Sequence, residues 1–437
     1  APGSDGGVPD PVPPGRGVSS GADRAAPAGD GAAGPASPSP PVVLVAADLT
    51  PAQAALLDPA EVAGVVLAAG SPTAHATLLL RARGVPAVLG AGGAVLDLAD
   101  GTPIALDGDT GELVVDPSPE RLAGFRDRAA ARAGRDRVAA GRAGEPAITR
   151  DGVRVLVGAN IGAREDAVAA AAGGADLAGL VRTEFLFLDR AQAPDVEEQV
   201  AAYRGIAEAL GGRRITLRTL DVGGDKPLPY LPLPAEANPF LGLRGIRLAD
   251  RHAGLFRDQL LAAVRVAHET PVSLMFPMVS TLDELLAARR ELAAVIAAEG
   301  RGTPSGLQVG IMVEVPAAAL KAAAFVPHVE FLSIGTNDLV QYALAAERGN
   351  PAVAHLADPL DPGVLRLVQA VCRAAGDRVL VAVCGEAAAD PRAATVLVGL
   401  GVRELSVVPP AVPGIKQLVR DLDTAGAAST ATDALDS

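Results

Sequence analysis

The sequence predicts an α/β protein built on a (β/α)8 TIM barrel that follows a small β/α domain. Eight short apolar runs recur between residues 149 and 424, and each is followed by a helical pattern. The runs are almost continuously apolar, as in parallel strands that are buried on both faces. Residues 42–117 instead hold shorter runs separated by Gly and Asp turns, which indicates a separate small domain.

The first elements in chain order are a tail, the small domain and a connector. Residues 1–41 are nearly half Pro and Gly, and such a segment buries too little apolar surface to order, so we expect a disordered tail. The small domain over 42–117 has one helix signal, near 75–83, and we interpret it as a swivelling β/α domain. Residues 118–148 hold mainly Ala and Arg with some Asp and Glu and have no strand signal, which predicts a helical connector.

The barrel is expected over residues 149–424, and residues 425–437 are expected to be a disordered tail. A doubly wound open sheet is the alternative for the main domain, but eight regular units over this length favour a closed barrel. The eight apolar runs lie at 153–159, 177–182, 215–222, 272–279, 309–315, 330–335, 378–384 and 404–409.

Composition excludes several classes of function. The net charge is -13, which argues against general binding to nucleic acid or anionic membranes. No apolar stretch reaches the roughly 18 residues of a spanning helix, and no signal peptide is recognisable, so we expect no membrane insertion. The 2 cysteines cannot build a disulfide framework, which favours a reducing compartment and a cytoplasmic location.

Arginines gather where the predicted strands end, which is where barrels carry their chemistry. Any single arginine at a strand end is explained as well by a structural ion pair as by a binding site. Together they could clamp a small anion that bears both phosphate and carboxylate groups, because guanidinium binds such groups through two parallel hydrogen bonds. The candidates are Arg182, Arg218, Arg244 and Arg348.

Two carboxylates and a carboxamide occupy similar positions. Glu314 ends the fifth run, and Asn337 and Asp338 follow the sixth. Two hard oxygen ligands with no nearby His or Cys suit Mg²⁺ better than Zn²⁺.

A cysteine and a histidine complete the set of candidates. Cys384 ends the seventh run; it is either a small buried hydrophobe or a thiol that donates a proton to an enolate. His75 lies near the start of a predicted helix, where amides and the helix dipole favour phosphate, and imidazole can act as a nucleophile near neutral pH. His75 is therefore a candidate phosphoryl acceptor, and a capping or core histidine is an equal alternative.

Several motifs carry a resemblance to a known family. In order along the chain they are GSPTAH (70–75), VRTEFLF (181–187), LRTLDVGGDKPLPY (217–230), NPFLGLRGIR (238–247), GIMVEVPAAA (310–319), FLSIGTNDLVQY (331–342) and CGE (384–386). They resemble Enzyme I, the phosphoenolpyruvate–protein phosphotransferase of the bacterial sugar phosphotransferase system. The resemblance runs from about residue 42 to 420 and covers the phosphohistidine domain, the connector and the phosphoenolpyruvate-binding barrel.

The resemblance implies a role for each candidate. His75 matches the residue that carries the phosphoryl group, and Cys384 matches the acid that protonates the enolate to pyruvate. Glu314 and Asp338 match the ligands of Mg²⁺, and Asp338 also lies among the substrate-binding residues. Implied partners are a histidine-containing phosphocarrier protein and a second copy of the chain, paired through the barrel. The residues that match the phosphoenolpyruvate ligands are Arg182, Arg218, Arg244, Asn337 and Arg348.

The chain also departs from the family pattern. The family carries a helical domain that docks the phosphocarrier, and this sequence has no match to it, so we expect phosphorylation of His75 but slow onward transfer. Around His75 the family more often has GGRTSH, where this chain has GSPTAH. Two alternatives remain: a phosphoenolpyruvate sensor or scaffold that no longer delivers phosphate, and a relative of pyruvate phosphate dikinase or phosphoenolpyruvate synthase.

Overall fold

The computed structural model of the chain describes residues 41–70, 76–77, 80, 83–224, 228–249, 251–348, 350 and 352–437. His75 and most of the helix expected near 75–83 lie outside these residues, as does nearly all of the tail expected over 1–41.

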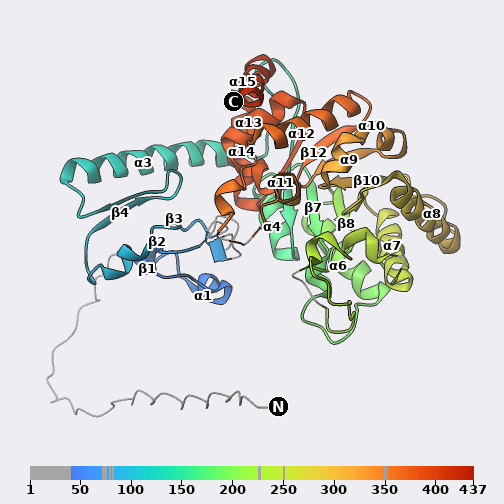
Figure 1. Ribbon diagram of the computed structural model, residues 1–437. Helices are drawn as coiled ribbons and strands as arrows, with labels where there is room; N and C mark the ends of the chain where they lie inside the picture. Colours follow the sequence, from blue (N-terminus) through green and yellow to red (C-terminus); the bar gives the residue numbers. More distant parts are fainter. Residues whose placement is uncertain are drawn as a thin grey trace, which may run out of the picture. The chain divides into compact units, whose positions relative to one another are not determined.

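Eight parallel strands close into a barrel, as the sequence predicts (Figure 1). Each strand pairs with the next along the chain, and the last pairs with the first, so the sheet has no free edge. Each apolar run identified in the sequence supplies one strand. The strands are β6 (Leu156–Ile161), β7 (Ala178–Arg182), β8 (Ile215–Arg218), β9 (Val272–Phe276), β10 (Leu307–Val313), β11 (Phe331–Ile334), β12 (Leu380–Val383) and β13 (Glu404–Val407).

Helices follow the strands, and several begin at a side-chain cap that the sequence encodes. In α8, Thr281 and Glu284 bond each other's backbone amides, which satisfies two donors that the helix itself cannot. The helices of the barrel are α4 (Arg164–Ala172), α5 (Glu184–Phe187), α6 (Val196–Ala209), α7 (Ala253–Ala267), α8 (Leu282–Glu299), α9 (Pro316–Leu320), α10 (Ala322–Phe325), α11 (Thr336–Leu344), α12 (Pro362–Ala375), α13 (Pro391–Leu400), α14 (Val412–Asp421) and α15 (Thr424–Asp436). Short 3-10 turns are η2 (Pro239–Leu241), η3 (Gly245–Leu248), η4 (Val326–His328), η5 (Ala354–Leu356), η6 (Glu386–Ala389) and η7 (Pro409–Ala411).

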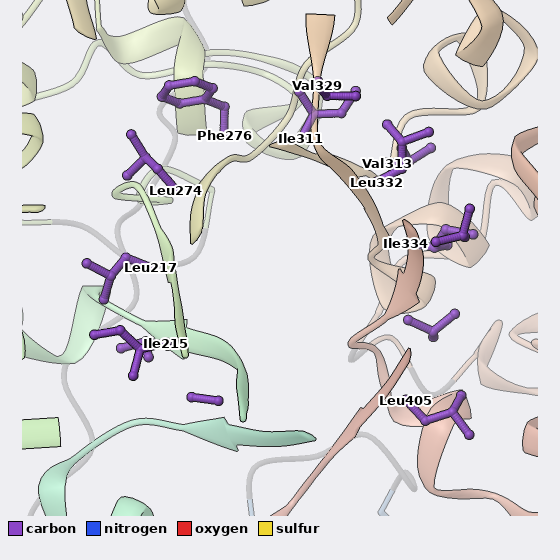
Figure 2. Packing of buried hydrophobic residues seen from close by; sticks show 14 of the residues in the cluster. Ile215, Leu217, Leu274, Phe276, Ile311, Val313, Val329, Leu332, Ile334 and Leu405 are labelled. Atoms are coloured by element: carbon purple, nitrogen blue, oxygen red, sulfur yellow. The ribbon is translucent and has the colours of Figure 1, made fainter. Parts of the chain in front are cut away.

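Alternate residues of the strands belong to two different cores. One large cluster contains Leu217, Leu274 and Ile334 and joins the strands to the surrounding helices (Figure 2). The residues of opposite parity form a separate small cluster, whose members are Leu180, Met275, Met312, Phe331 and Cys384. Because neighbouring residues of a strand point to opposite faces, this second cluster fills the interior of the barrel. Residues with the same parity at the strand ends therefore face the mouth of the barrel.

The small domain contains a three-stranded parallel sheet and a two-stranded antiparallel one. The first sheet has β1 (Val42–Ala46), β2 (Val62–Leu67) and β3 (Ala87–Val88), and the second has β4 (Ile104–Asp107) and β5 (Glu112–Val115). Helix α1 (Pro51–Leu56) and the 3-10 turn η1 (Gly93–Asp97) lie between the strands in sequence. The long helix α3 (Pro119–Gly141) follows β5; Ser118 caps it, and Arg128 forms ion pairs with Asp107 and Glu112 of the β4–β5 hairpin.

The C-terminal segment corrects one expectation from the sequence. Residues 425–437 are not a disordered tail, because helix α15 occupies nearly all of them. Asp423 caps the helix by accepting from the Gly426 amide at 2.7 Å. Its Ala431 and Leu435 pack with Leu365 of α12 and other buried residues. A segment with few large apolar residues is thus ordered by packing of small side chains against the barrel helices.

The helices within the described part of the chain include none that is both long and apolar enough to span a membrane.

Candidate active site

Two arginines end neighbouring strands of the barrel and lie in register. Arg182 closes β7 and is paired along the sheet with Arg218, the last residue of β8. Arg218 is buried; its guanidinium donates to Glu184 and lies 3.2 Å from Asp221 Oδ2. Burial alone would lower the pKa of Arg218, but the carboxylates of Glu184 and Asp221 outweigh burial and raise it above its ordinary value. Protein carboxylates therefore already balance the charge of Arg218.

The side chain of Arg182 is differently placed. It makes no hydrogen bond or ion pair to the residues that the structure describes. Burial, and after it the nearby charge of Arg218, lowers the pKa of Arg182 below its ordinary value. An anion at the mouth of the barrel would offset both the burial of Arg182 and its repulsion by Arg218. It would also accept charge-assisted hydrogen bonds from Arg182. Arg182 is thus the arginine of this pair with free capacity for an anionic ligand.

Arg244 joins two acidic residues from different parts of the barrel. Its Nε and Nη2 donate to Asp221 at 3.2 and 2.9 Å, and its Nη1 and Nη2 donate to Asp338 at 3.3 and 3.2 Å. Nη1 also lies 3.3 Å from the Tyr342 hydroxyl. Burial would lower the pKa of Arg244, but Asp221 and Asp338 raise it above its ordinary value. This arginine is held rigidly and stays charged.

A glycine lets the chain segment that carries Arg244 come close to the end of β8. Gly223 has a φ of 107°, and a Cβ at this position would lie 2.4 Å from the carbonyl oxygen of Leu243. Any larger residue would push the 243–244 segment away from the barrel mouth. The position of Arg244 therefore depends on a glycine from the neighbouring loop.

Glu314 and Asp338 lie close enough to affect each other electrostatically. Glu314 follows β10, is 1% exposed, and its Oε1 accepts from the Met278 amide at 2.7 Å. Burial raises the pKa of Glu314 to about 8, and the charges of Asp338 and Asp221 add to the rise. Asp338 lies in the first turn of α11. A buried glutamate whose ionisation is disfavoured by burial and by a neighbouring carboxylate is a site that a cation would stabilise.

This pair also sets a limit on the kind of metal site. Within the described ranges, no group of three or more His, Cys, Asp and Glu side chains could hold a metal ion. A site with two carboxylates suits Mg²⁺, which commonly keeps several waters and takes further oxygens from a phosphorylated substrate. The donor set thus fits a divalent cation held jointly by protein and substrate, and does not fit a closed structural zinc site.

Cys384 lies immediately after β12 and faces the interior of the barrel. It is 3% exposed and belongs to the inner cluster with Met275 and Met312. Burial raises the pKa of the Cys384 thiol to about 11, and the nearby Ser333 hydroxyl and Arg218 charge oppose that rise. Its Sγ lies 3.8 Å from the carbonyl oxygen of Ile334. The thiol therefore keeps its proton at neutral pH and can act as an acid.

Asn337 contacts the segment that carries Cys384. Its Oδ1 accepts from the Glu386 amide at 2.9 Å, and its Nδ2 donates to Glu386 Oε1 at 3.1 Å. The start of α11 and the residues after β12 are thereby tied together. In this arrangement the Asn337 carboxamide is engaged by protein.

Arg348 makes none of the contacts that join this cluster, and the structure does not describe His75. Arg348 lies beyond the end of α11, and its backbone amide donates to Gln341 Oε1 at 2.8 Å. Its side chain makes no hydrogen bond or ion pair to the described residues. His75 lies outside the described residues. The structure thus brings together Arg182, Arg218, Arg244, Glu314, Asn337, Asp338 and Cys384 at one end of the barrel.

Sequence reasoning assigned no role to two acidic residues that prove central. Glu184 and Asp221 are both buried, and between them they hold Arg218 and Arg244. Their positions after strands β7 and β8 were the available signal. The arginine with which each acidic residue pairs depends on how the strand ends converge. The spacing of residues along the chain does not predict these pairs.

Comparison with known proteins agrees with this architecture. Residues 138–424 match the family of the PEP-utilising enzyme, PEP-binding domain, and residues 38–111 match the PEP-utilising enzyme, mobile domain. These two matches correspond to the barrel and to most of the small domain.

Individual relatives carry related names. The chain is 48% identical over 384 residues to a multiphosphoryl transfer protein of Rhodobacter capsulatus, covering 88% of this chain and 46% of that protein. It is 47% identical over 392 residues to a phosphoenolpyruvate-protein phosphotransferase of Haloferax volcanii, covering 88% and 68%. A phosphoenolpyruvate-protein phosphotransferase of a Bacillus species is 40% identical over 388 residues, covering 87% and 67%.

The chain therefore spans less than half of the multiphosphoryl transfer protein and about two thirds of the two phosphotransferases. The matched part includes both domains described above. On the family matches and the identity to these relatives, the chain belongs to the PEP-utilising enzymes and is a relative of the phosphoenolpyruvate-protein phosphotransferases.

Proposed function

We propose that the chain transfers the phosphoryl group of phosphoenolpyruvate to His75 and releases pyruvate. The observation that carries this proposal is the convergence, at one end of the barrel, of three arginines, two adjacent carboxylates and a protonated thiol. Phosphoenolpyruvate is a small anion with a phosphate and a carboxylate, and its product needs a proton at carbon. The site supplies a complement to each of these features.

The arginines bind and orient the substrate. Arg182 has free capacity for an anion, whereas Arg218 and Arg244 are fixed and charged through their acidic neighbours. Fixed charges need no rearrangement when negative charge moves from phosphate to the enol oxygen, which is how such sites lower a barrier. Arg348 and Asn337 are further candidates for substrate contact, as the family resemblance implies.

Glu314 and Asp338 are the residues that would hold Mg²⁺. A divalent ion bound there would neutralise charge on the phosphate oxygens and on the enol oxygen. Its binding would also favour the ionised form of Glu314, which burial and the charge of Asp338 otherwise disfavour.

The reaction has two steps on this chain. The His75 imidazole attacks phosphorus, the P–O bond to the enol oxygen breaks, and that oxygen keeps the electron pair. The enolate then takes a proton at its methylene carbon from the Cys384 thiol, giving pyruvate and a thiolate. The thiol is suited to this role because burial keeps it protonated at neutral pH.

The proposed function also implies a location for the chain and two partners. We place the chain in the cytoplasm, where its 2 free and buried cysteines are compatible with reducing conditions. The onward acceptor would be a histidine-containing phosphocarrier protein of a sugar transport system, and the barrel would pair with that of a second copy.

Labelling with phosphoenolpyruvate tests this function. The purified chain is incubated with Mg²⁺ and phosphoenolpyruvate labelled in its phosphate, and intact mass and pyruvate release are measured. One acid-labile, base-stable phosphoryl group should appear, with one pyruvate per chain. His75→Ala should abolish the label while phosphoenolpyruvate still binds to the barrel.

A second histidine variant is the control. His355 is exposed and lies outside the cluster at the barrel mouth, so His355→Ala should label normally. A label that survives His75→Ala would show that another residue is the acceptor.

A further inference from the structure

The Cys384 peptide is held by Asn160, which lies two strands away in the barrel. Asn160 lies near the end of β6, the first barrel strand, and its Nδ2 donates to the Cys384 carbonyl oxygen at 3.2 Å. Strand β13 lies between β12 and β6 in the barrel, so this bond reaches across a strand. A carboxamide donor to the Cys384 carbonyl fixes the direction of that peptide.

Asn160 is itself oriented by a neighbouring hydroxyl. Ser406 lies on the intervening strand β13, is fully buried, and its Oγ donates to Asn160 Oδ1 at 2.8 Å. Because Ser406 occupies the oxygen of the carboxamide, the nitrogen of Asn160 points toward Cys384. The two bonds form one chain from Ser406 through Asn160 to Cys384.

The start of α11 contacts the next residues of the same segment. A Cβ at Gly385 would lie 2.7 Å from the Thr336 amide nitrogen, so the segment packs directly on the start of that helix. Asn337 makes two hydrogen bonds to Glu386, one residue further on. Residues 384–386 are thus held both by the start of α11 and by the Asn160–Ser406 pair.

We propose that Asn160 is a positioning residue for Cys384, and that it acts by holding the Cys384 peptide so that the thiol is aimed at the carbon that receives the proton. The proposal rests on the function proposed above for Cys384. In the step concerned, the S–H bond breaks and a C–H bond forms at the methylene carbon from the electron pair of the enolate. The enolate oxygen becomes the pyruvate carbonyl, and sulfur keeps its pair as a thiolate.

The reverse of this step gives an assay that does not involve His75. The minor thiolate fraction of Cys384, which grows as the pH rises toward the thiol pKa of about 11, removes a methyl proton from pyruvate and returns a deuteron from solvent. Methyl exchange in D₂O that depends on Cys384, measured at alkaline pH, therefore reports on the Cys384 geometry. The exchange rate is followed by proton NMR with the full chain, Mg²⁺ and pyruvate. Phosphoenolpyruvate affinity is measured in parallel by calorimetric titration.

Two substitutions at Asn160 separate hydrogen bonding from packing. Asn160→Asp keeps the shape and the acceptor for Ser406 but cannot donate to the Cys384 carbonyl, whereas Asn160→Ala removes both. Each should lower the exchange rate about tenfold or more, because small displacements of reacting groups are costly. Phosphoenolpyruvate affinity should stay within about twofold.

A matched pair of serine variants tests the hydrogen bond from Ser406 to Asn160. Ser406→Ala should lower exchange by a smaller factor than Asn160→Asp, because Asn160 keeps its donor but loses its orienting partner. Ser273 is another buried barrel serine; it contacts Gln308 and Arg214 and does not contact Asn160. Ser273→Ala should leave exchange unchanged.

The outcomes are distinguishable. No exchange by the unsubstituted chain, or exchange that survives Cys384→Ala, would overturn the proposed function, and the positioning role would fall with it. Exchange that depends on Cys384 but is unchanged in Asn160→Asp would overturn the positioning role alone. So would an equal loss of phosphoenolpyruvate affinity in Asn160→Asp, because it would indicate general disruption of the site.

Discussion

Asp221 and Arg244 form a side-on ion pair in which each carboxylate oxygen accepts one guanidinium N–H, at 3.2 Å to Nε and 2.9 Å to Nη2. Both residues are buried, and Asp221 Oδ2 also lies 3.2 Å from Arg218 Nη1. One carboxylate thus fixes two of the arginines that face the mouth of the barrel.

We expect Asp221→Asn to weaken both folding and substrate binding. The variant leaves two buried guanidiniums with less compensation, which costs on the order of 3 kcal/mol of stability. Phosphoenolpyruvate affinity should fall because Arg218 and Arg244 are no longer aligned. Calorimetric unfolding and titration with phosphoenolpyruvate measure the two effects.

The control for Asp221→Asn is an exposed pair of the same geometry. Glu269 accepts from Arg204 at two positions, each at 2.7 Å, with both side chains partly in solvent. Glu269→Gln should cost less than about 1 kcal/mol and leave phosphoenolpyruvate affinity unchanged. Equal losses in the two variants would contradict a special role for Asp221.

Phosphoenolpyruvate binding should depend on a divalent cation through Glu314. Removal of Mg²⁺ with EDTA should weaken binding about tenfold or more, because the cation neutralises phosphate charge next to buried carboxylates. Glu314→Gln should bind weakly with or without Mg²⁺. Its fold should be preserved because the glutamine carbonyl can still accept from the Met278 amide. Titration calorimetry in the two conditions measures the dependence.

Glu330 provides the matched control for Glu314. It also accepts one backbone amide, that of Val309 at 2.7 Å, but it lies before β11, at the opposite end of the strands. Glu330→Gln should keep the full Mg²⁺ dependence. Equal affinity of the unsubstituted chain in Mg²⁺ and in EDTA would refute the cation site.

A buried glutamate at the start of β13 should make stability fall as the pH rises. Burial raises the pKa of Glu404 to about 7, with Arg214 opposing the rise and Asp176 adding to it. The folded chain therefore holds a proton that the unfolded chain has lost between about pH 4.5 and pH 7. Stabilisation is complete below this window and is lost above it.

Glu404→Gln removes this titration. The variant should resemble the unsubstituted chain at pH 5 and be more stable at pH 8, by up to the order of 3 kcal/mol. Differential scanning calorimetry of both proteins at the two pH values gives the comparison. A difference in melting temperature that is the same at pH 5 and pH 8 would show that Glu404 does not titrate in this range.

Two helical glycines should respond in opposite ways to the same substitution. A Cβ at Gly399 of α13 would collide with the Ala427 carbonyl group of α15, with the next backbone atom 2.9 Å away. Gly399→Ala should destabilise the chain by about 1–3 kcal/mol by forcing α15 away. Gly414 of α14 has nothing within 4 Å of such a Cβ, so Gly414→Ala should be neutral or stabilising by up to about 1 kcal/mol. Calorimetric melting temperatures compare the variants, and a loss of equal size in Gly414→Ala would contradict close packing of α15.

The sequence by itself determined the barrel and the kinds of residue at its mouth. Each strand is a run of apolar residues long enough to be recognised alone, and eight repeats of strand and helix admit few topologies. In a barrel the C-terminal ends of all strands meet at one face, so Arg182, Arg218, Glu314 and Cys384 had to lie near one another. The apolar runs and the rule that strand ends meet at one face of a barrel were sufficient to predict which residues gather at its mouth.

Only the tertiary structure decided which charges meet. That Asp221 holds Arg244, that Arg182 keeps a free side chain, and that Asn160 reaches Cys384 across β13 all depend on distances between strands far apart in sequence. Helix α15 was missed for a related reason, because its Ala-rich sequence is stabilised by close contact with α13 and has little apolar pattern of its own. Hydrophobic periodicity is local and can be recognised in sequence. Hydrogen bonds and ion pairs instead need their partners within about 3–4 Å, so they exist only once the fold has brought those partners together.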